Sequence, residues 1–176
     1  HDGGALFVGR ISTEKGVPVM TDAWRNLALP LAIAGDGPLF ESLSSSDLPA
    51  SVSFLGRQTK EEVFGAMKKA RFLVMPSLWY EGFPMVIVEA FAHGLPVVCS
   101  RLGGMAEVVR DGVSGLHFNP GDAADLAAKI QSLIDDPERA RRMGEAARQQ
   151  FLDHYGPAQN LSLLEGIYAA AQAELA

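Results

Sequence analysis

Short apolar runs recur along the chain, separated by stretches in which apolar positions repeat with the period of a helix. Most of these runs have only four to six residues and are bounded by Gly or Pro, which favours strands over helices. Several show no polar alternation, as is typical of strands buried on both faces of a parallel sheet. The expected strands are Ala5–Val8, Leu29–Ala34, Val52–Leu55, Phe72–Met75, Pro96–Cys99 and Gly115–Phe118.

Helical patterns fill the intervals between these strands, and some carry recognisable start signals. The stretch "TKEE" predicts a capping box, in which the Thr59 side chain caps a helix and the side chain of Glu62, three residues later, bonds back to the N–H of Thr59. Pro137 suits the first turn of a helix because its missing N–H would be unpaired there. The expected helices are Gly16–Leu27, Pro38–Ser45, Thr59–Ala70, Pro84–His93, Met105–Arg110, Asp122–Asp135, Pro137–His154 and Pro157–Leu175.

The alternation of strand and helix predicts an α/β fold. We expect a Rossmann-like, doubly wound, parallel six-stranded sheet flanked by helices, with extra helices at the C-terminal end. Ligands of such sheets bind beyond the carboxyl ends of the strands. The loops that follow strands therefore carry the functional information.

Composition and charge narrow the function classes. With 176 residues, 48% of them hydrophobic and 20% charged, residues 1–176 are expected to form one globular domain. The net charge of −6 argues against general nucleic-acid binding. The single cysteine, Cys99, cannot form an internal disulfide, which favours a reducing compartment, and we expect a cytoplasmic protein. No run approaches the roughly 18 apolar residues of a membrane helix.

The beginning of the chain bears on its domain organisation. There is no initiating Met, and "HDGG" leads directly into the first expected strand. The chain therefore looks like a piece cut from a longer protein at a linker.

The loop after the fourth expected strand, within "PSLWYEGFPMVIVEA", carries the strongest signal. Pro84 suits a helix start, and Gly82 before it lets a ligand approach the backbone. The exposed N–H groups of Phe83, Met85 and Val86 would then face a phosphate. This pattern predicts an anion site at the start of a helix.

Two glutamates flank that helix start. Glu81 precedes it, and Glu89 lies at most about 12 Å farther along the helix axis. Each carboxylate can accept hydrogen bonds from two neighbouring hydroxyls, so the pair could hold the two sugars of one nucleotide sugar. The alternative is that Glu81 is a helix-start charge and Glu89 an exposed helix residue. We favour function, because a charge within "MVIVEAFA" needs a partner or a ligand.

Other loops after strands carry weaker candidates. Arg10 and Lys15 lie in "GRISTEKG" before a helix and could bind a diphosphate, or could be solvated surface charges. Arg57 and Gln58 could line a base, or form a turn and helix cap. "AGDGP" lacks the third glycine of a dinucleotide fingerprint, because Phe40 stands there. No cluster has metal-ligand spacing and no Asp-x-Asp pair occurs, so we expect no metal and no cofactor.

These motifs together resemble the C-terminal, donor-binding domain of family 4 glycosyltransferases, which have the two-domain GT-B fold. The likeness rests on "FVGRISTEKG", "AGDGP", "FLGR", "PSLWYEGFPMVIVEA", "GLPVV" and "GGMAEVVRDGVSGLHFNPGD" in that order. It implies that Glu81 contacts the transferred sugar and Glu89 the ribose, while Arg10 and Lys15 neutralise the diphosphate. It also implies a retaining, metal-independent transfer.

The resemblance further implies that this chain binds the donor, a nucleoside-diphosphate sugar. The N-terminal acceptor domain is absent from the chain, so we expect the fragment alone to be inactive as a transferase. Peripheral membrane association could occur through that absent domain. The alternatives are half of a sugar-nucleotide epimerase or hydrolase, and a non-catalytic module that binds a nucleotide sugar.

Overall fold

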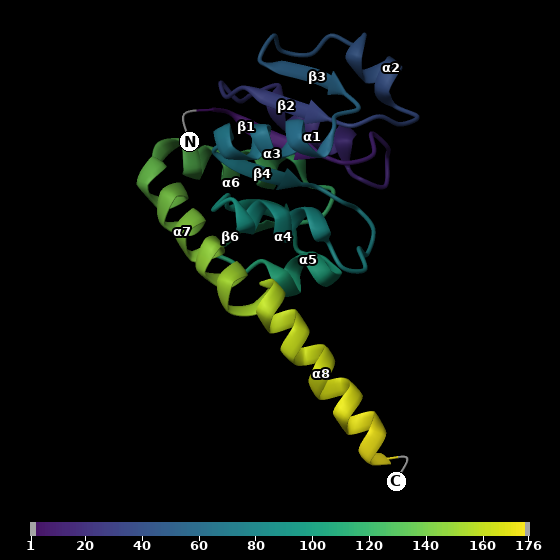
Figure 1. Cartoon of the computed structure of the whole chain (residues 1–176). Coiled ribbons are helices and arrows are strands. Elements are labelled where there is room, and N and C mark those ends of the chain that lie inside the picture. The colour runs from purple at the N-terminus through teal and green to yellow at the C-terminus, as the bar shows by residue number, and fades with distance from the viewer. Residues whose placement is uncertain (1–2, 175–176) are drawn as a thin grey trace.

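The computed structural model describes residues 3–174 and confirms the expected six-stranded parallel sheet. His1 and Asp2 of the expected linker, and Leu175 at the end of the last expected helix, lie outside these residues. The strands follow the order β3-β2-β1-β4-β5-β6, so the chain reverses direction across the sheet between β1 and β4 (Figure 1). The strands are β1 Ala5–Val8, β2 Leu31–Ala34, β3 Val52–Gly56, β4 Phe72–Met75, β5 Val97–Ser100 and β6 Gly115–Phe118.

The burial of the strands depends on the helices that cover them, and α6 and α7 both contact the edge strand β6. Every residue of β4, β5 and β6 is buried, as their largely apolar sequences predict, and Ser100 and His117 are buried with them. Strand β3 lies at an edge, and its residues alternate between half-buried and exposed. Two expected strands begin later than predicted. Pro30 and Pro96 precede β2 and β5, where proline can supply a carbonyl but no N–H to the ladder.

Eight helices are found within residues 3–174, and those after β1 to β5 alternate with strands as expected. The capping box at the start of the third is confirmed, because Thr59 Oγ1 accepts from the N–H of Glu62 and the Glu62 carboxylate accepts from the N–H of Thr59. The helices are α1 Val17–Trp24, α2 Phe40–Ser44, α3 Lys60–Lys69, α4 Met85–Ala92, α5 Gly103–Val108, α6 Ala123–Asp135, α7 Pro137–His154 and α8 Pro157–Glu174.

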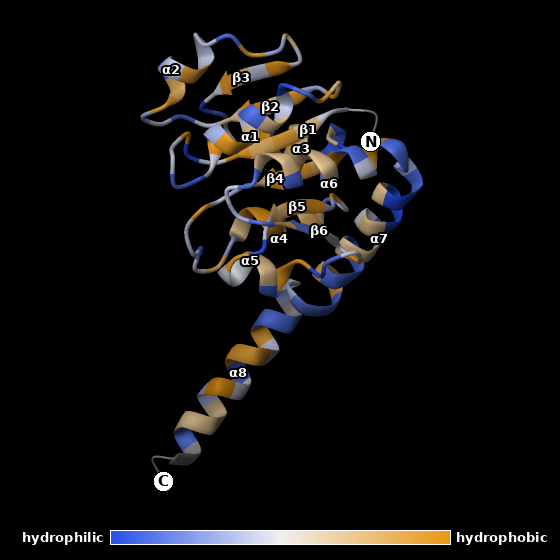
Figure 2. Ribbon diagram, turned by 180° about the vertical axis from the view of Figure 1, so that it is seen from behind, coloured by the Kyte–Doolittle hydropathy of each residue, from blue (hydrophilic) through white to orange (hydrophobic). Residues whose placement is uncertain are grey.

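The helices cover both faces of the sheet with two separate cores. On one face α1 packs against α6, which in turn contacts β5 and β6, and Trp24 and Ile130 are buried in this core. On the other face α3, α4 and α5 pack over β4 and β5, around Met67, Phe91 and Met105. Helix α7 contributes to both cores. Hydrophobic colour accordingly follows the central strands, and hydrophilic colour dominates α7 (Figure 2). This double burial leaves the ends of the strands as the place for a ligand.

Helix α8 differs from the rest because it projects away from the layered body (Figure 1). Its large apolar side chains are exposed and add nothing to either core. None of the helices within residues 3–174 combines the length and apolar composition that a membrane-crossing helix needs. The exposed apolar residues of α8 are Leu161, Leu163, Leu164, Ile167 and Tyr168.

Candidate functional site

The candidate site lies beyond the carboxyl ends of β1 and β4, the neighbouring strands at which the strand order reverses. A crevice at this switch point is where doubly wound sheets bind their ligands. Two loops form it here, residues 9–16 after β1 and residues 76–84 after β4. We call them the first loop and the second loop.

Backbone contacts hold the two loops against each other. The N–H of Leu78 donates to the carbonyl of Glu14 at 2.8 Å. Gly16 has a φ of +69°, and a Cβ built on it would lie only 1.8 Å from the carbonyl oxygen of Pro76. Only glycine tolerates both this left-handed backbone and this close approach. Gly16 therefore lets the first loop lie directly on the second.

This packing brings Lys15 and Glu81 together as an ion pair. Lys15 Nζ lies 2.7 Å from Glu81 Oε1 and 2.8 Å from Oε2, so it binds both carboxylate oxygens. The side chains are 30% and 18% exposed, respectively, so the pair is only partly screened by water. Ser77 Oγ also donates to Glu81 Oε1. The sequence predicted that Lys15 binds the diphosphate and Glu81 the transferred sugar. It did not predict that the two side chains contact each other.

The second predicted carboxylate, that of Glu89, differs from Glu81 in having no protein partner among the described residues. Glu89 lies on α4 and is half-buried, and within residues 3–174 its carboxylate has no hydrogen-bond or ion-pair partner. Its backbone carbonyl contacts His93 Nδ1 at 2.7 Å. Glu81 and Glu89 line the same cavity of about 380 Å³, together with Arg10 and Lys15. A partner-free carboxylate in a cavity wall is available to a ligand.

The start of α4 differs in part from the prediction. The helix begins at Met85, and Pro84 is its N-cap, with φ −80° and ψ 79°. These angles form an inverse γ-turn, in which the N–H of Met85 donates to the carbonyl of Phe83 at 2.9 Å. The Met85 amide is therefore occupied. Within residues 3–174 the amides of Phe83 and Val86 have no acceptor, so two of the three expected donors remain available.

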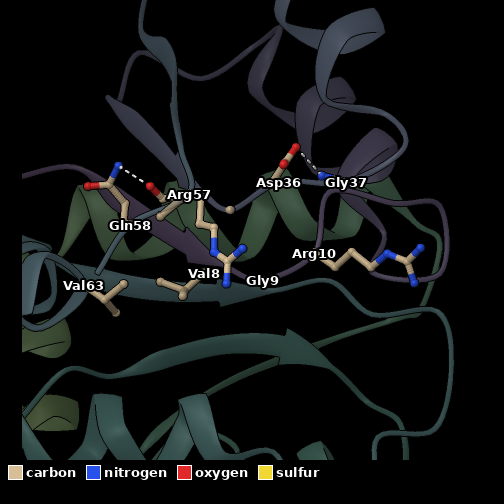
Figure 3. Close-up of a pocket in the computed structure, with 10 residues that line it drawn as sticks. Val8, Gly9, Arg10, Asp36, Gly37, Arg57, Gln58 and Val63 are labelled. Atoms are coloured by element: carbon tan, nitrogen blue, oxygen red, sulfur yellow. Dashed lines mark hydrogen bonds between the residues drawn. The ribbon is translucent and has the colours of Figure 1, made fainter. Parts of the chain in front are cut away.

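The remaining predicted residues are divided between a second cavity and the surface. Arg57 and Gln58 line an adjacent cavity of about 470 Å³, which shares Gly9 and Arg10 with the first (Figure 3). Arg57 points toward Val8 and Gly9 at its floor. Gln58 Nε2 donates to the carbonyl of Leu55 at 2.7 Å. The two cavities together form one extended site.

Gly82 is the one predicted binding residue outside both cavity walls. It is exposed, and a Cβ built on it would meet nothing within 4 Å. Its carbonyl oxygen would instead lie 2.5 Å from a Cβ on Gly104, at the start of α5. Gly82 therefore contributes to the packing of the second loop.

Two functional features escaped the sequence analysis. Ser77 was not singled out, although it follows a proline at the end of a buried strand, where ligands meet doubly wound sheets. Gly16 was read only as a helix start. Among residues 3–174 no group of three or more His, Cys, Asp and Glu side chains is placed to hold a metal ion.

The fold, with a cavity at its switch point, is Rossmann-like and matches one half of the GT-B architecture. Residues 3–150 match the family model described as "Glycosyl transferases group 1". The chain belongs to this family and corresponds to its C-terminal domain. The predicted resemblance is thereby confirmed at the level of this family.

Known proteins show the same relationship. The chain is 37% identical to an uncharacterised glycosyltransferase of Methanocaldococcus jannaschii, over 82% of this chain and 42% of that protein. It is 34% identical to a glycogen synthase of Mycobacterium tuberculosis, over 95% of this chain and 42% of that one. The chain thus spans less than half the length of these relatives. The crystal structure of HepE from Anabaena with UDP and glucose shares the fold, with a TM-score of 0.84 and 24% identity over 96% of this chain and 49% of that one.

Proposed function

We propose that this chain is the donor-binding half of a glycosyltransferase, which transfers a sugar from a nucleoside-diphosphate sugar to an acceptor. One observation carries the proposal: a single cavity at the switch point contains the Lys15–Glu81 pair and Glu89, whose carboxylate has no partner within residues 3–174. The family membership supports it, and so does the HepE structure, which contains UDP and glucose.

Each part of the donor has a matching group in the site. Glu81 accepts from a hydroxyl of the transferred sugar and Glu89 from the ribose diol, because carboxylates are strong acceptors. The base enters the adjacent cavity beside Arg57 and Gln58. The donor therefore extends from one cavity to the other.

The diphosphate lies between the sugar and the base. Arg10 lines both cavities, and Lys15 lines the first. The amides of Phe83 and Val86 add two donors at the start of α4, where the helix dipole favours an anion. This arrangement supplies the positive charge that a diphosphate needs.

The proposed chemistry breaks the bond between the anomeric carbon and the β-phosphate oxygen. The acceptor oxygen bonds to that carbon, negative charge develops on the departing diphosphate, and the acceptor hydroxyl gives its proton to the departing phosphate oxygen. Donors already aimed at the diphosphate lower this barrier, since they need no reorganisation as the charge forms. We further propose family 4 membership, retention of the anomeric configuration and independence of a metal, with Arg10 and Lys15 supplying the positive charge.

The acceptor site is proposed to belong to an N-terminal domain outside residues 1–176. Membrane association, if the acceptor is a lipid, would also belong to that domain. We place the protein in the cytoplasm, supported by Cys99, which is free and buried. Residues 1–176 alone should bind donor and transfer nothing, and turnover by this purified fragment with an acceptor supplied would contradict that.

Binding measurements test the donor-binding role directly. Calorimetric titration with UDP, GDP and ADP should show that one of them binds, and that its monophosphate binds at least about tenfold more weakly because it has lost a phosphate contact. A panel of sugar esters of that nucleotide should contain one that binds more tightly than the bare diphosphate. Absence of binding by all three diphosphates at millimolar concentration would refute the proposed function.

A further inference from the structure

Ser77 is a buried hydroxyl whose contact lies within the site. Its residue is 1% exposed, and its Oγ donates to Glu81 Oε1. We propose that Ser77 is a positioning residue, which fixes the Glu81 carboxylate so that one particular oxygen, Oε2, receives the hydroxyl of the transferred sugar. This inference rests on the proposed function and adds to it how the protein recognises a hydroxyl of the sugar.

The position of the Ser77 hydroxyl is fixed by both of its chain neighbours. Pro76 before it lies against Gly16 of the first loop, and the N–H of Leu78 after it donates to the carbonyl of Glu14. Ser77 also directly follows Pro76 at the end of β4, a wholly buried strand. A donor held on such a backbone holds its acceptor in turn.

A count of hydrogen bonds shows which oxygen is left for a ligand. A carboxylate offers about four lone-pair sites, two on each oxygen. Glu81 Oε1 accepts from Ser77 Oγ and from Lys15 Nζ, so both of its sites are used. Glu81 Oε2 accepts only from Lys15 Nζ, at 2.8 Å, within residues 3–174. One acceptor site therefore remains, and it is on Oε2.

Lys15 alone could not hold this orientation once the donor arrives. Its ammonium has three N–H groups on a flexible stem, and an incoming diphosphate competes for them. The Ser77 hydroxyl is neutral and directed at Glu81, so it has no comparable attraction to the diphosphate. Ser77 therefore keeps Oε1 occupied while Lys15 is shared with the phosphates.

The Ser77→Ala variant tests the proposal through a ratio of two affinities. The probes are the diphosphate among UDP, GDP and ADP that the wild-type protein binds, and the sugar ester of it that binds most tightly. We expect the affinity for the sugar ester to fall about fivefold to tenfold, because a hydrogen bond to a charged group is lost. The affinity for the bare diphosphate, which does not touch Glu81, should stay within about twofold.

Ser100→Ala is the matched control. Ser100 lies at the end of β5, the strand beside β4, and is 0% exposed, and within residues 3–174 its Oγ has no hydrogen-bond partner. Its truncation removes a buried hydroxyl of the same kind without loosening Glu81, so both affinities should match those of the wild type. Circular dichroism melts of both variants check that each is folded.

The outcomes separate this inference from the proposed function. Equal losses of both affinities in Ser77→Ala, or no loss of either, would overturn the positioning role and leave donor binding intact. A wild-type protein in which no sugar ester binds more tightly than its diphosphate would also overturn it. Failure of the wild-type protein to bind any of the three diphosphates would instead refute the proposed function itself.

Discussion

The two sides of the cavity at the switch point hold their carboxylates in different ways. On the loop side, Glu81 is held by side chains, with Lys15 Nζ within 2.8 Å of both oxygens and Ser77 Oγ on Oε1. On the helix side, Glu89 has no side-chain partner within residues 3–174. Its backbone belongs to α4, which is anchored in the core by Ile87, Val88, Ala90 and Phe91.

The difference shows how a fold can place the same functional group by two routes. A helix fixes its residues through hydrogen bonds and core packing, so Glu89 needs no partner and stays open to a ligand. A loop lacks that support, and a carboxylate on it is positioned only if neighbouring donors hold it. Ligand binding on the Glu81 side should therefore depend on residues elsewhere in the sequence that hold Glu81 in place. Ligand binding on the Glu89 side should depend on Glu89 alone.

The Gly16→Ala variant should have the largest effect, and only on the loop side. The added Cβ would meet the Pro76 carbonyl at 1.8 Å on a backbone with φ +69°, so the two loops must move apart. We expect a loss of about 2–4 kcal/mol in the free energy of unfolding, measured by urea titration. The affinity for the sugar ester should fall together with it.

Gly65→Ala supplies the control for that change. Gly65 lies inside α3, and a Cβ built there would meet nothing within 4 Å. The same substitution should stabilise the protein there by about 0.5–1 kcal/mol, because alanine favours a helix. If Gly16→Ala were as harmless as Gly65→Ala, the loops would not depend on their close contact.

Lys15→Ala should weaken donor binding next most strongly. It removes the cation that pairs with Glu81 and is proposed to bind the diphosphate, and we expect the affinity for the sugar ester to fall about tenfold to a hundredfold by calorimetry. The free energy of unfolding should fall by only about 0.5–1 kcal/mol, because the pair is partly exposed to water.

Lys129→Ala is the control that distinguishes the loss of Lys15 within the site from the loss of one positive charge anywhere on the protein. Lys129 pairs with Asp125 at 3.9 Å on α6 with a similar side-chain exposure of 36%, and it lines neither of the two cavities of the candidate site. Its loss changes the net charge equally and should leave donor affinity within about twofold. Equal weakening by both lysine variants would show that Lys15 acts only through overall charge.

The fold was predictable because its signals are local. Unbroken apolar runs gave the buried strands, and Thr59 with Glu62 gave the start of α3. Lys15 and Glu81 are 66 positions apart, and their contact depends on how two loops pack, which no local pattern records. The γ-turn at Pro84 was likewise hidden, since proline fixes φ and leaves ψ to the surrounding structure.

Glu89→Ala should have the smallest and most selective effect. The Glu89 carboxylate has no partner to lose in the part of the chain that the structure describes, and alanine favours helices, so the free energy of unfolding should stay within about 0.5 kcal/mol of the wild type or rise. Binding should lose its preference for ribose, which we measure as the ratio of affinities for the ribose and 2′-deoxyribose forms of the bound diphosphate. We expect a ratio of about ten in the wild-type protein and about one in the variant, because the carboxylate proposed to accept from the diol is gone.

Lys15→Ala, on the loop side, is the control for this prediction. It should keep the ribose preference while weakening the binding of both the ribose and the 2′-deoxyribose forms. If Glu89→Ala kept the preference for ribose, Glu89 would not be the residue that contacts the ribose. The proposed difference in role between the loop side and the helix side would then be wrong.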